Sequence, residues 1–382
     1  MLFNSIEFLF FLPLVFTVYW LILGGGKCKN IFIVAASYVF YGWWDWRFLF
    51  LMALTTFCSY FSGILLVKYD TYPLRRKWIC GGNILLNLLI LGYFKYYNFF
   101  GENFAAFFRM LGWEVDWVTR DILLPVGISF YTFQALSYTI DVYRRKMFPT
   151  HDVVAFFAFI SFFPQLVAGP IERATHLLPQ FLKPRVFSYA AAVDGMRQIL
   201  WGLFKKMVVA DNCADAVNEI FANYQTADGM QLFLGALFFT FQIYGDFSGY
   251  SDIAIGTARL FGVDLMRNFS YPYFSRDIAE FWRRWHISLT TWFRDYIYIP
   301  LGGSRCARWK VMRNTAVIFL VSGFWHGANW TYVCWGAYHA MLFFPLLYFG
   351  KNRKHVDGVA EGRILPTVKE ALQMLMTFLL VV

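Results

Sequence analysis

The sequence predicts an all-α membrane protein, and two observations support this prediction. Of its 382 residues, 59% are hydrophobic and only 15% are charged, whereas a soluble domain carries about a quarter charged residues. The apolar residues also gather in runs near the length of about 20 residues that a membrane helix needs, and Lys and Arg clusters separate the runs. We therefore expect a polytopic helical bundle of roughly 9–11 spans, with re-entrant and interfacial amphipathic helices around a central cavity.

The net charge and the cysteines give no support for a nucleic-acid partner, a disulfide framework or a zinc site. A net charge of +10 would suggest a nucleic-acid partner for a soluble protein, but basic loops at the cytoplasmic face of a bilayer explain it more simply. The six cysteines are scattered without a CxxC pair, so neither a disulfide framework nor a zinc site follows from them. We expect the lipid bilayer as a partner, no nucleic acid, no metal and no bound cofactor.

The first third of the chain alternates apolar runs with basic clusters. Phe8–Leu23 lacks the basic start and the cleavage site of a signal peptide, so we expect a retained first helix. Asn98–Trp117 is aromatic but interrupted by charged residues and is predicted to lie at the membrane interface. The other apolar runs are expected to be membrane segments: Ile31–Tyr41, Phe48–Val67, Trp78–Phe94 and Ile122–Ile140.

The middle of the chain contains less regular segments. Two prolines and a glycine within Phe163–Ile171 predict a bend or re-entrant turn, and a polar loop is expected from Glu172 to about Phe187. Tyr189–Val209 is compatible with a span or with a surface helix. Met230–Phe247 is a predicted span, and it runs into the polar octet Gly245–Asp252.

The polar octet Gly245–Asp252 raises the question of a serine nucleophile. Its order is G-x-x-S-G rather than the G-x-S-x-G of a nucleophile elbow, and no predicted strand precedes it. A polar break in a helix, or a helix N-cap, is therefore the expected role.

Arg276–Ile299 is predicted to form an amphipathic helix at the membrane interface. Its apolar and aromatic residues recur at three-to-four spacing on one face, while Arg283, His286 and Arg294 lie on another. Membrane anchoring accounts for the arginines and tryptophans of such a helix. It leaves His286 unexplained, because a neutral imidazole adds little to lipid binding.

The most informative stretch is Ser322–Trp330, with His326 at its centre. It interrupts an apolar run from Ala316 to Gly350, so we expect two membrane helices that meet at a polar break. An imidazole at such depth normally faces a cavity or a partner, which makes His326 a candidate functional residue. The alternative is a core histidine that hydrogen-bonds to a neighbouring carbonyl. The final apolar segment, Ala371–Val382, is shorter than a span, and we expect the native chain to continue beyond it.

These stretches resemble, in sequence and order, the membrane-bound O-acyltransferase (MBOAT) family. The resemblance is closest to its bacterial polysaccharide branch, which includes the membrane subunit of alginate O-acetyltransferase. It covers essentially the whole chain, which is therefore expected to be a single MBOAT-type domain, residues 1–382, truncated at its C-terminal end. The matching blocks are MLFNS at the start, Leu124–Gln134 (LPVGISFYTFQ), Phe163–Pro170 (FPQLVAGP), Phe281–Leu289 (FWRRWHISL), Trp292–Tyr296 (WFRDY), Pro300–Gly303 (PLGG), Phe324–Ala328 (FWHGA) and Trp335–His339 (WGAYH).

The resemblance implies a multi-pass enzyme of the bacterial inner membrane that moves an acyl group from a cytoplasmic thioester toward an extracytoplasmic polysaccharide. The family's catalytic histidine falls on His326 and its second functional histidine on His286. The donor is expected to be acetyl-CoA or another acyl thioester. A separate periplasmic or extracytoplasmic acyltransferase subunit is the expected partner, and the polysaccharide is reached indirectly through it.

The chemistry of the residues agrees with this implication. Acyl transfer to a hydroxyl needs a group that accepts its proton, which suits a histidine at neutral pH. Asn329 could stabilise an oxyanion, and the arginines near His286 could attract an anionic donor, although anchoring explains them equally well. His339 is expected to be structural. The candidate substrate-binding residues are Arg283, Arg294, Asp295, Asn329 and Trp325.

Two other functions remain open from the sequence. The teichoic-acid relatives share the same blocks, so D-alanyl transfer is an alternative to acetyl transfer. A transporter or channel of a polysaccharide export machine, with His326 as a pore residue, is the alternative from another class, but the internal repeats typical of many transporters are not seen.

Overall fold

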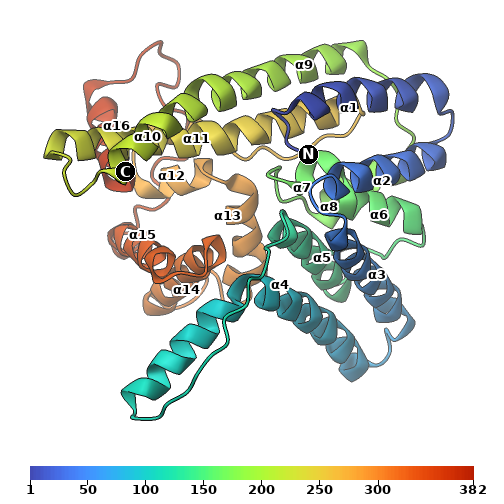
Figure 1. Cartoon of the computed structure of the whole chain (residues 1–382), viewed down its shortest axis with the longest axis horizontal. Coiled ribbons are helices and arrows are strands. Elements are labelled where there is room, and N and C mark those ends of the chain that lie inside the picture. The colour runs from blue at the N-terminus through green and yellow to red at the C-terminus, as the bar shows by residue number, and fades with distance from the viewer. The chain divides into compact units, whose positions relative to one another are not determined.

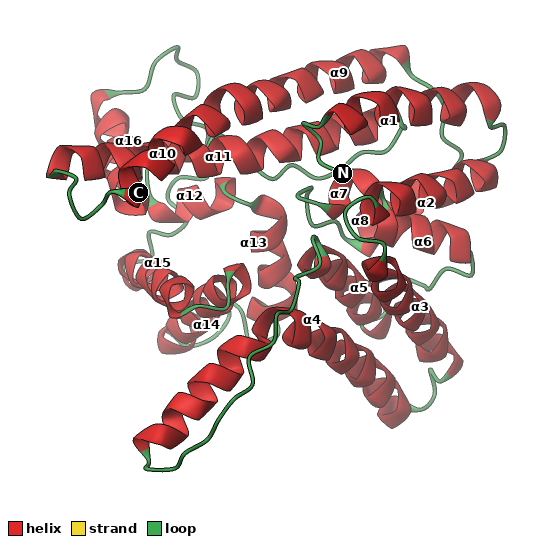
Figure 2. Cartoon of the chain, in the orientation of Figure 1, coloured by secondary structure: helices red, strands yellow, loops and turns green.

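The computed structural model describes all 382 residues, and its regular structure is entirely helical (Figure 1, Figure 2). The all-α prediction is confirmed. The chain divides into two compact units. The first comprises Met1–Leu91 and Pro125–Arg267, and the second comprises Gly92–Leu124 and Asn268–Val382.

The first unit contains most of the helices. In chain order they are α1 (Ile6–Thr17), η1 (a π-helix, Val18–Ile22), α2 (Gly26–Gly42), α3 (Arg47–Lys68), the first half of α4 (Pro73–Met110), α5 (Ile128–Tyr143), α6 (Val153–Ser161), α7 (Phe163–Leu166), α8 (Ala174–Leu182), α9 (Tyr189–Leu203), η2 (a π-helix, Phe204–Ala210), α10 (Asp211–Ala222) and α11 (Gly229–Leu260). The predicted turn at Phe163–Ile171 is present as the short α7 and the bend after it, but the expected polar loop is wrong, because it contains α8.

Two helices are long and apolar enough to cross a membrane, α3 and α4; α1 with η1 forms a shorter apolar helix. The larger number of spans stays a prediction. The helix α4 also differs from expectation: the sequence suggested a span ending at Phe94 and a separate interfacial segment, but one helix of 38 residues continues to Met110. At 1.5 Å per residue it is about 57 Å long. The predicted span Ile122–Ile140 is shorter than expected, because α5 begins only after Gly127, whose φ is 73°.

The helices α9 and α11 pack side by side (Figure 1). Gly195 faces the Gly256 carbonyl and Gly202 faces the Gly249 carbonyl, so closely that a methyl group on Gly195 or Gly202 would lie 2.7 Å or 2.6 Å from the oxygen. The absence of side chains therefore lets the two backbones touch. The segment that the sequence left undecided between span and surface helix is α9 with η2, lying against α11.

The polar octet Gly245–Asp252 lies inside α11, so the expected helix break or N-cap at this position is wrong. The cap of α11 is Asp228, seventeen positions earlier in the chain than Gly245, and it forms a capping box with Gln231. The octet's carboxylates instead pair with lysines of η2: Asp246 lies 2.8 Å from Lys206, and Asp252 contacts Lys205. The sequence missed this because the partners are on another helix.

The second unit contains the second half of α4 and the C-terminal helices. These are η3 (a 3₁₀-helix, Pro272–Phe274), α12 (Ile278–Arg284), α13 (Ile287–Phe293), η4 (a π-helix, Arg294–Tyr298), α14 (Arg308–His326), α15 (Trp330–Tyr348) and α16 (Val368–Val381). The predicted continuous helix Arg276–Ile299 is wrong, because it breaks between α12 and α13, at Trp285 and His286.

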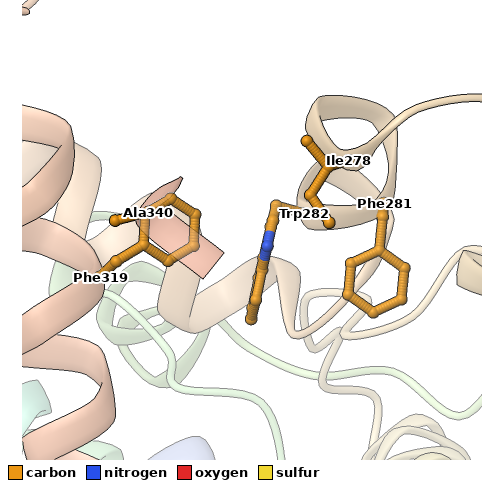
Figure 3. Close-up of a cluster of buried hydrophobic side chains, with 5 residues drawn as sticks. All are labelled: Ile278, Phe281, Trp282, Phe319 and Ala340. Carbon is orange, nitrogen blue, oxygen red and sulfur yellow. The ribbon is translucent and has the colours of Figure 1, made fainter. Parts of the chain in front are cut away.

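A cluster of buried apolar side chains holds α12 against α14 and α15. Trp282 of α12 points toward Phe319 of α14 and Ala340 of α15 (Figure 3). The rings of Trp282 and Phe319 lie 5.3 Å apart in an edge-on arrangement, a geometry that aromatic pairs favour. This packing brings the α12–α13 break next to the end of α14.

Candidate functional site

The break between α14 and α15 contains three residues, Gly327 to Asn329. The α14 helix continues through Ser322 and ends at His326, so the break lies in the second half of the predicted stretch Ser322–Trp330, and Asn329 caps the start of α15. The Oδ1 atom of Asn329 accepts a hydrogen bond from the Thr331 amide at 3.0 Å. The ring of Tyr332 packs directly on Gly327, where a methyl group would overlap it. His326 therefore occupies the last turn of α14, directly before the non-helical residues Gly327 to Asn329.

His286 occupies the break between α12 and α13 in an unusual backbone conformation. Its φ of 42° and ψ of 55° lie in the left-handed region, which residues other than Gly adopt uncommonly and which Asn, Asp and His adopt more often than the rest. The residue is 2% exposed. Asn268 fixes the start of α13, since its carbonyl accepts from the Ile287 amide at 2.9 Å and its Oδ1 accepts from the Ser288 hydroxyl at 2.6 Å. Strain of this kind is typical of functional sites.

The two histidines line one small cavity of about 50 Å³. His286 is buried, whereas His326 stays exposed, so one imidazole forms the closed side of the site and the other is accessible. The cavity has room for a group the size of a water molecule or a methyl group. Its remaining lining residues are apolar or carry a hydroxyl: Trp282, Trp285, Leu289, Thr290, Phe293, Ile318, Phe319 and Ser322.

Two indole rings pack against the imidazoles of His286, His326 and His339. Trp325 lies 6.0 Å from His286 and 4.9 Å from His326, measured between ring centres. Trp335 lies 5.3 Å from His326 and 4.8 Å from His339. These edge-on and tilted contacts place apolar ring surface beside each imidazole. Trp325, a predicted substrate-binding residue, is buried and lies close to both candidate catalytic residues.

The remaining predicted residues lie outside the lining of this cavity. Arg283 donates to the Asn352 carbonyl at 2.9 Å and to the His355 carbonyl, so its guanidinium holds the loop between α15 and α16. Arg294 pairs with Asp295 at 2.8 Å. Asn329, which the sequence suggested for an oxyanion, uses its side-chain oxygen as the α15 cap. The structure thus brings together His286, His326 and Trp325.

Sequence reasoning gave Lys95 and Tyr96 no role in this site. The Lys95 ammonium donates to the Trp325 carbonyl, and the Tyr96 hydroxyl donates to the Phe324 carbonyl at 3.0 Å. Both bind the last turn of α14, next to His326. No local signal in the sequence could reveal this, because 230 positions separate Lys95 from Trp325.

Comparisons with known proteins identify the relatives of this chain. Residues 41–379 match the model of the membrane-bound O-acyltransferase family. The chain is 41% identical to the probable alginate O-acetylase AlgI of Pseudomonas aeruginosa, over all of this chain and 71% of that protein. It is 34% identical to a peptidoglycan O-acetyltransferase of Helicobacter pylori, over 89% of this chain and 69% of the relative. A teichoic acid D-alanyltransferase of Bacillus subtilis is 29% identical over 64% of each chain.

Proposed function

Because this chain belongs to the membrane-bound O-acyltransferase family and is an acyltransferase, we propose that it passes an acetyl group from a cytoplasmic thioester, acetyl-CoA, across the inner membrane. The acetyl group then serves the O-acetylation of an extracytoplasmic polysaccharide such as alginate. The observation that carries this proposal is the cavity shared by His286 and His326. The similarity to alginate O-acetylases supports acetyl as the group transferred.

In the proposed reaction His326 is the general base. Its imidazole takes the proton of an acceptor hydroxyl while the oxygen attacks the thioester carbonyl, so a C–O bond forms and the C–S bond breaks. The imidazolium then returns the proton to the leaving thiolate. His286, held by its backbone and by the Trp325 ring, supports the reaction from the closed side of the cavity. The apolar lining keeps out water, which would otherwise hydrolyse the thioester.

The donor site is proposed to lie beside α12 and α13. Arg283 and Arg294 are exposed cations that could attract the phosphates of a CoA-type donor, and Asp295 orients Arg294 through their ion pair. His326 ends α14 on one side of the break, and Asn329 lies on the other side. The hydrogen bond from the Thr331 amide to Asn329 fixes the start of α15. The proposal also includes a multi-pass location in the inner membrane and an extracytoplasmic acyltransferase as partner.

The alternative within the same reaction class is D-alanyl transfer for teichoic acid. The D-alanyltransferase of Bacillus subtilis supports it, since its similarity extends over 64% of this chain. The D-alanyl group is larger than acetyl by one carbon and an amino group, and the amino group is charged at neutral pH when free. The lining of the shared cavity contains no carboxylate to pair with that charge, and this favours acetyl.

Radiolabelled acetyl-CoA added to inside-out vesicles tests the proposal. The wild-type protein is expected to transfer label to an acceptor, and His326→Ala is expected to lower transfer by about 10²–10⁴-fold, the usual effect of losing a general base. His151→Ala is the matched control, because His151 is exposed and lies in a loop of the first unit. A stable His326→Ala protein with near wild-type turnover would contradict the role of His326.

A further inference from the structure

The second half of α4 presents one face to the break between α14 and α15. Lys95, Tyr96, Phe99 and Asn103 follow the spacing of one helical face, and each contacts the segment from Phe324 to Trp330. The sequence offers no reason for a lysine in the middle of this aromatic stretch, since a cation inside a largely apolar helix is costly. Lys95 is accordingly only partly accessible.

Lys95 and Tyr96 bind consecutive carbonyls at the end of α14. The last four carbonyls of a helix have no partner within it, and a cation near them also interacts favourably with the helix dipole. Lys95 donates to the Trp325 carbonyl and lies 5.2 Å from the centre of the Trp325 ring, a favourable cation–π distance. Tyr96 donates to the Phe324 carbonyl, and its ring stacks on that of Phe324 at 4.3 Å and 14°.

The same face of α4 also holds the far side of the break. The Trp330 indole donates from Nε1 to the Asn103 Oδ1 atom at 2.8 Å. The ring of Phe99 lies 5.8 Å from the rings of both Phe324 and Trp330. The chain on each side of His326 is therefore tied to one rigid helix, whereas Gly323 and Gly327 beside it would otherwise permit the last turn of α14 to fray.

We propose that Lys95 is a positioning residue for acyl transfer: by binding the Trp325 carbonyl it holds the end of α14 so that His326 keeps its place at the cavity. This inference rests on the proposed function, because it presumes that His326 acts on the substrate. Lys95 itself acts through the backbone of α14. Its effect is therefore on the geometry of the reacting group, for which a displacement of about 1 Å can cost about 10²-fold in rate.

The test compares Lys95→Met, Lys95→Arg and the wild-type protein in liposomes, with turnover measured per folded molecule. Lys95→Met is expected to lower kcat by about 10²-fold with an unchanged KM for the thioester, and Lys95→Arg to restore most of the rate, because Arg also donates to carbonyls. Hydrogen exchange of the amides in residues 320–326 is expected to accelerate in Lys95→Met. The matched control is Lys77→Met, at an exposed position in the first half of α4, with neither effect.

Three results would overturn the inference. The first is normal kcat in folded Lys95→Met. The second is Lys95→Arg that is as slow as Lys95→Met. The third concerns the case in which Lys95→Met does not accumulate. Tyr96→Phe, which removes the neighbouring donor with little change in volume, is then tested in its place. Normal kcat and normal hydrogen exchange in Tyr96→Phe would overturn the inference. A wild-type protein that transfers no acyl group from either acetyl or D-alanyl thioesters would instead contradict the proposed function. The hydrogen-exchange data would still show whether Lys95 holds the end of α14.

Discussion

Gly323 of α14 and Gly336 of α15 lie directly against each other. A methyl group added to Gly323 would lie 3.3 Å from the Gly336 Cα atom, and one added to Gly336 would lie 3.4 Å from the Gly323 Cα atom. Each glycine also faces a backbone carbonyl of the opposite helix, Tyr332 for Gly323 and Phe319 for Gly336. The two helices that flank His326 are therefore in backbone contact one turn before the break.

Replacing Gly323 with Ala is expected to force α14 and α15 apart, because the new methyl group meets the Tyr332 carbonyl, which cannot rotate away. We expect a lower melting temperature in detergent and reduced acyl transfer per folded molecule. Gly81→Ala is the control, since nothing lies within 4 Å of a methyl group there and Ala favours the α4 helix. Equal melting temperatures for the two variants would contradict the close packing.

Arg276 and Glu280 form a buried ion pair at 3.1 Å, with side-chain exposures of 3% and 2%. Arg276→Met is expected to lower the free energy of unfolding by about 2 kcal/mol, because the buried Glu280 carboxylate loses one of its two arginine partners and keeps Arg284 at 2.5 Å. The double variant Arg276→Met with Glu280→Met should recover part of the loss. Chemical unfolding in mild detergent would measure both, and a single variant as stable as the wild type would exclude a structural role for the pair.

The left-handed backbone of His286 predicts an unequal response to two neutral substitutions. Asn tolerates this conformation better than Ala, so His286→Asn is expected to be more stable than His286→Ala by about 1 kcal/mol. Both variants lose the imidazole, and both should lose acyl transfer if His286 supports the reaction. Thermal unfolding alongside turnover separates the two effects. Ala more stable than Asn would be inconsistent with the conformation described.

Glu172 and His176 predict a dependence of stability on pH. The Nδ1–H group of His176 donates to the Glu172 carboxylate at 2.8 Å, and this hydrogen bond raises the pKa of His176, while burial raises the pKa of Glu172. Both shifts mean that the folded state binds more protons than the unfolded state. The His176 contribution is fully present below the ordinary histidine pKa of 6.5 and is lost as the pH rises through the raised pKa. The Glu172 contribution has the same sign and is fully present only below the ordinary pKa of 4.5.

Melting temperatures between about pH 6 and pH 8 measure this dependence. The melting temperature of the wild-type protein is expected to fall across that range. His176→Gln is expected to have a lower melting temperature at about pH 6 and a smaller fall from there to about pH 8. His151→Gln, at an exposed loop position, serves as the control. A slope in His176→Gln equal to that of the wild type would show that another group titrates.

The two arginines of the proposed donor site should differ in their effects. Arg294→Gln is expected to raise the KM for the thioester with little change in kcat, the result of losing uniform binding. Arg283→Gln should do the same and also lower stability, since the Arg283 guanidinium holds two loop carbonyls. Steady-state kinetics with acetyl-CoA would measure the first effect. An unchanged KM in both folded variants would assign these arginines to anchoring or packing.

Much of the fold followed from hydrophobic runs and breaks that act locally. A helix break near His326 was predictable because a polar, glycine-containing stretch interrupted an apolar run. Gly245–Asp252 misled for the opposite reason: its polar residues are satisfied by Lys205 and Lys206 on another helix, so the helix continues through them. Pattern alone does not show where the partner of a polar side chain lies.

The candidate site was predicted in its residue types but not in its geometry. His286 and His326 could both be named from the sequence, but their shared cavity depends on the break at Trp285 and His286. The three-to-four spacing of Arg276–Ile299 concealed that break, because two residues outside the helices barely disturb the periodicity of their neighbours. Lys95 was missed because its partner is a backbone carbonyl, which no sequence pattern records.

The paired glycines of α9 and α11 bear on how the membrane chain assembles. Gly195 and Gly202 are seven residues apart, as are Gly249 and Gly256, so the two contact points recur after about two helical turns. If one helix slid past the other by a few residues, Cβ atoms would face the opposing backbone at both points at once. Shape thus favours one alignment of the two helices, and the Arg259–Asp194 ion pair together with the hydrogen bond from Gln198 to Asp252 at 3.0 Å adds polar contacts across the same interface.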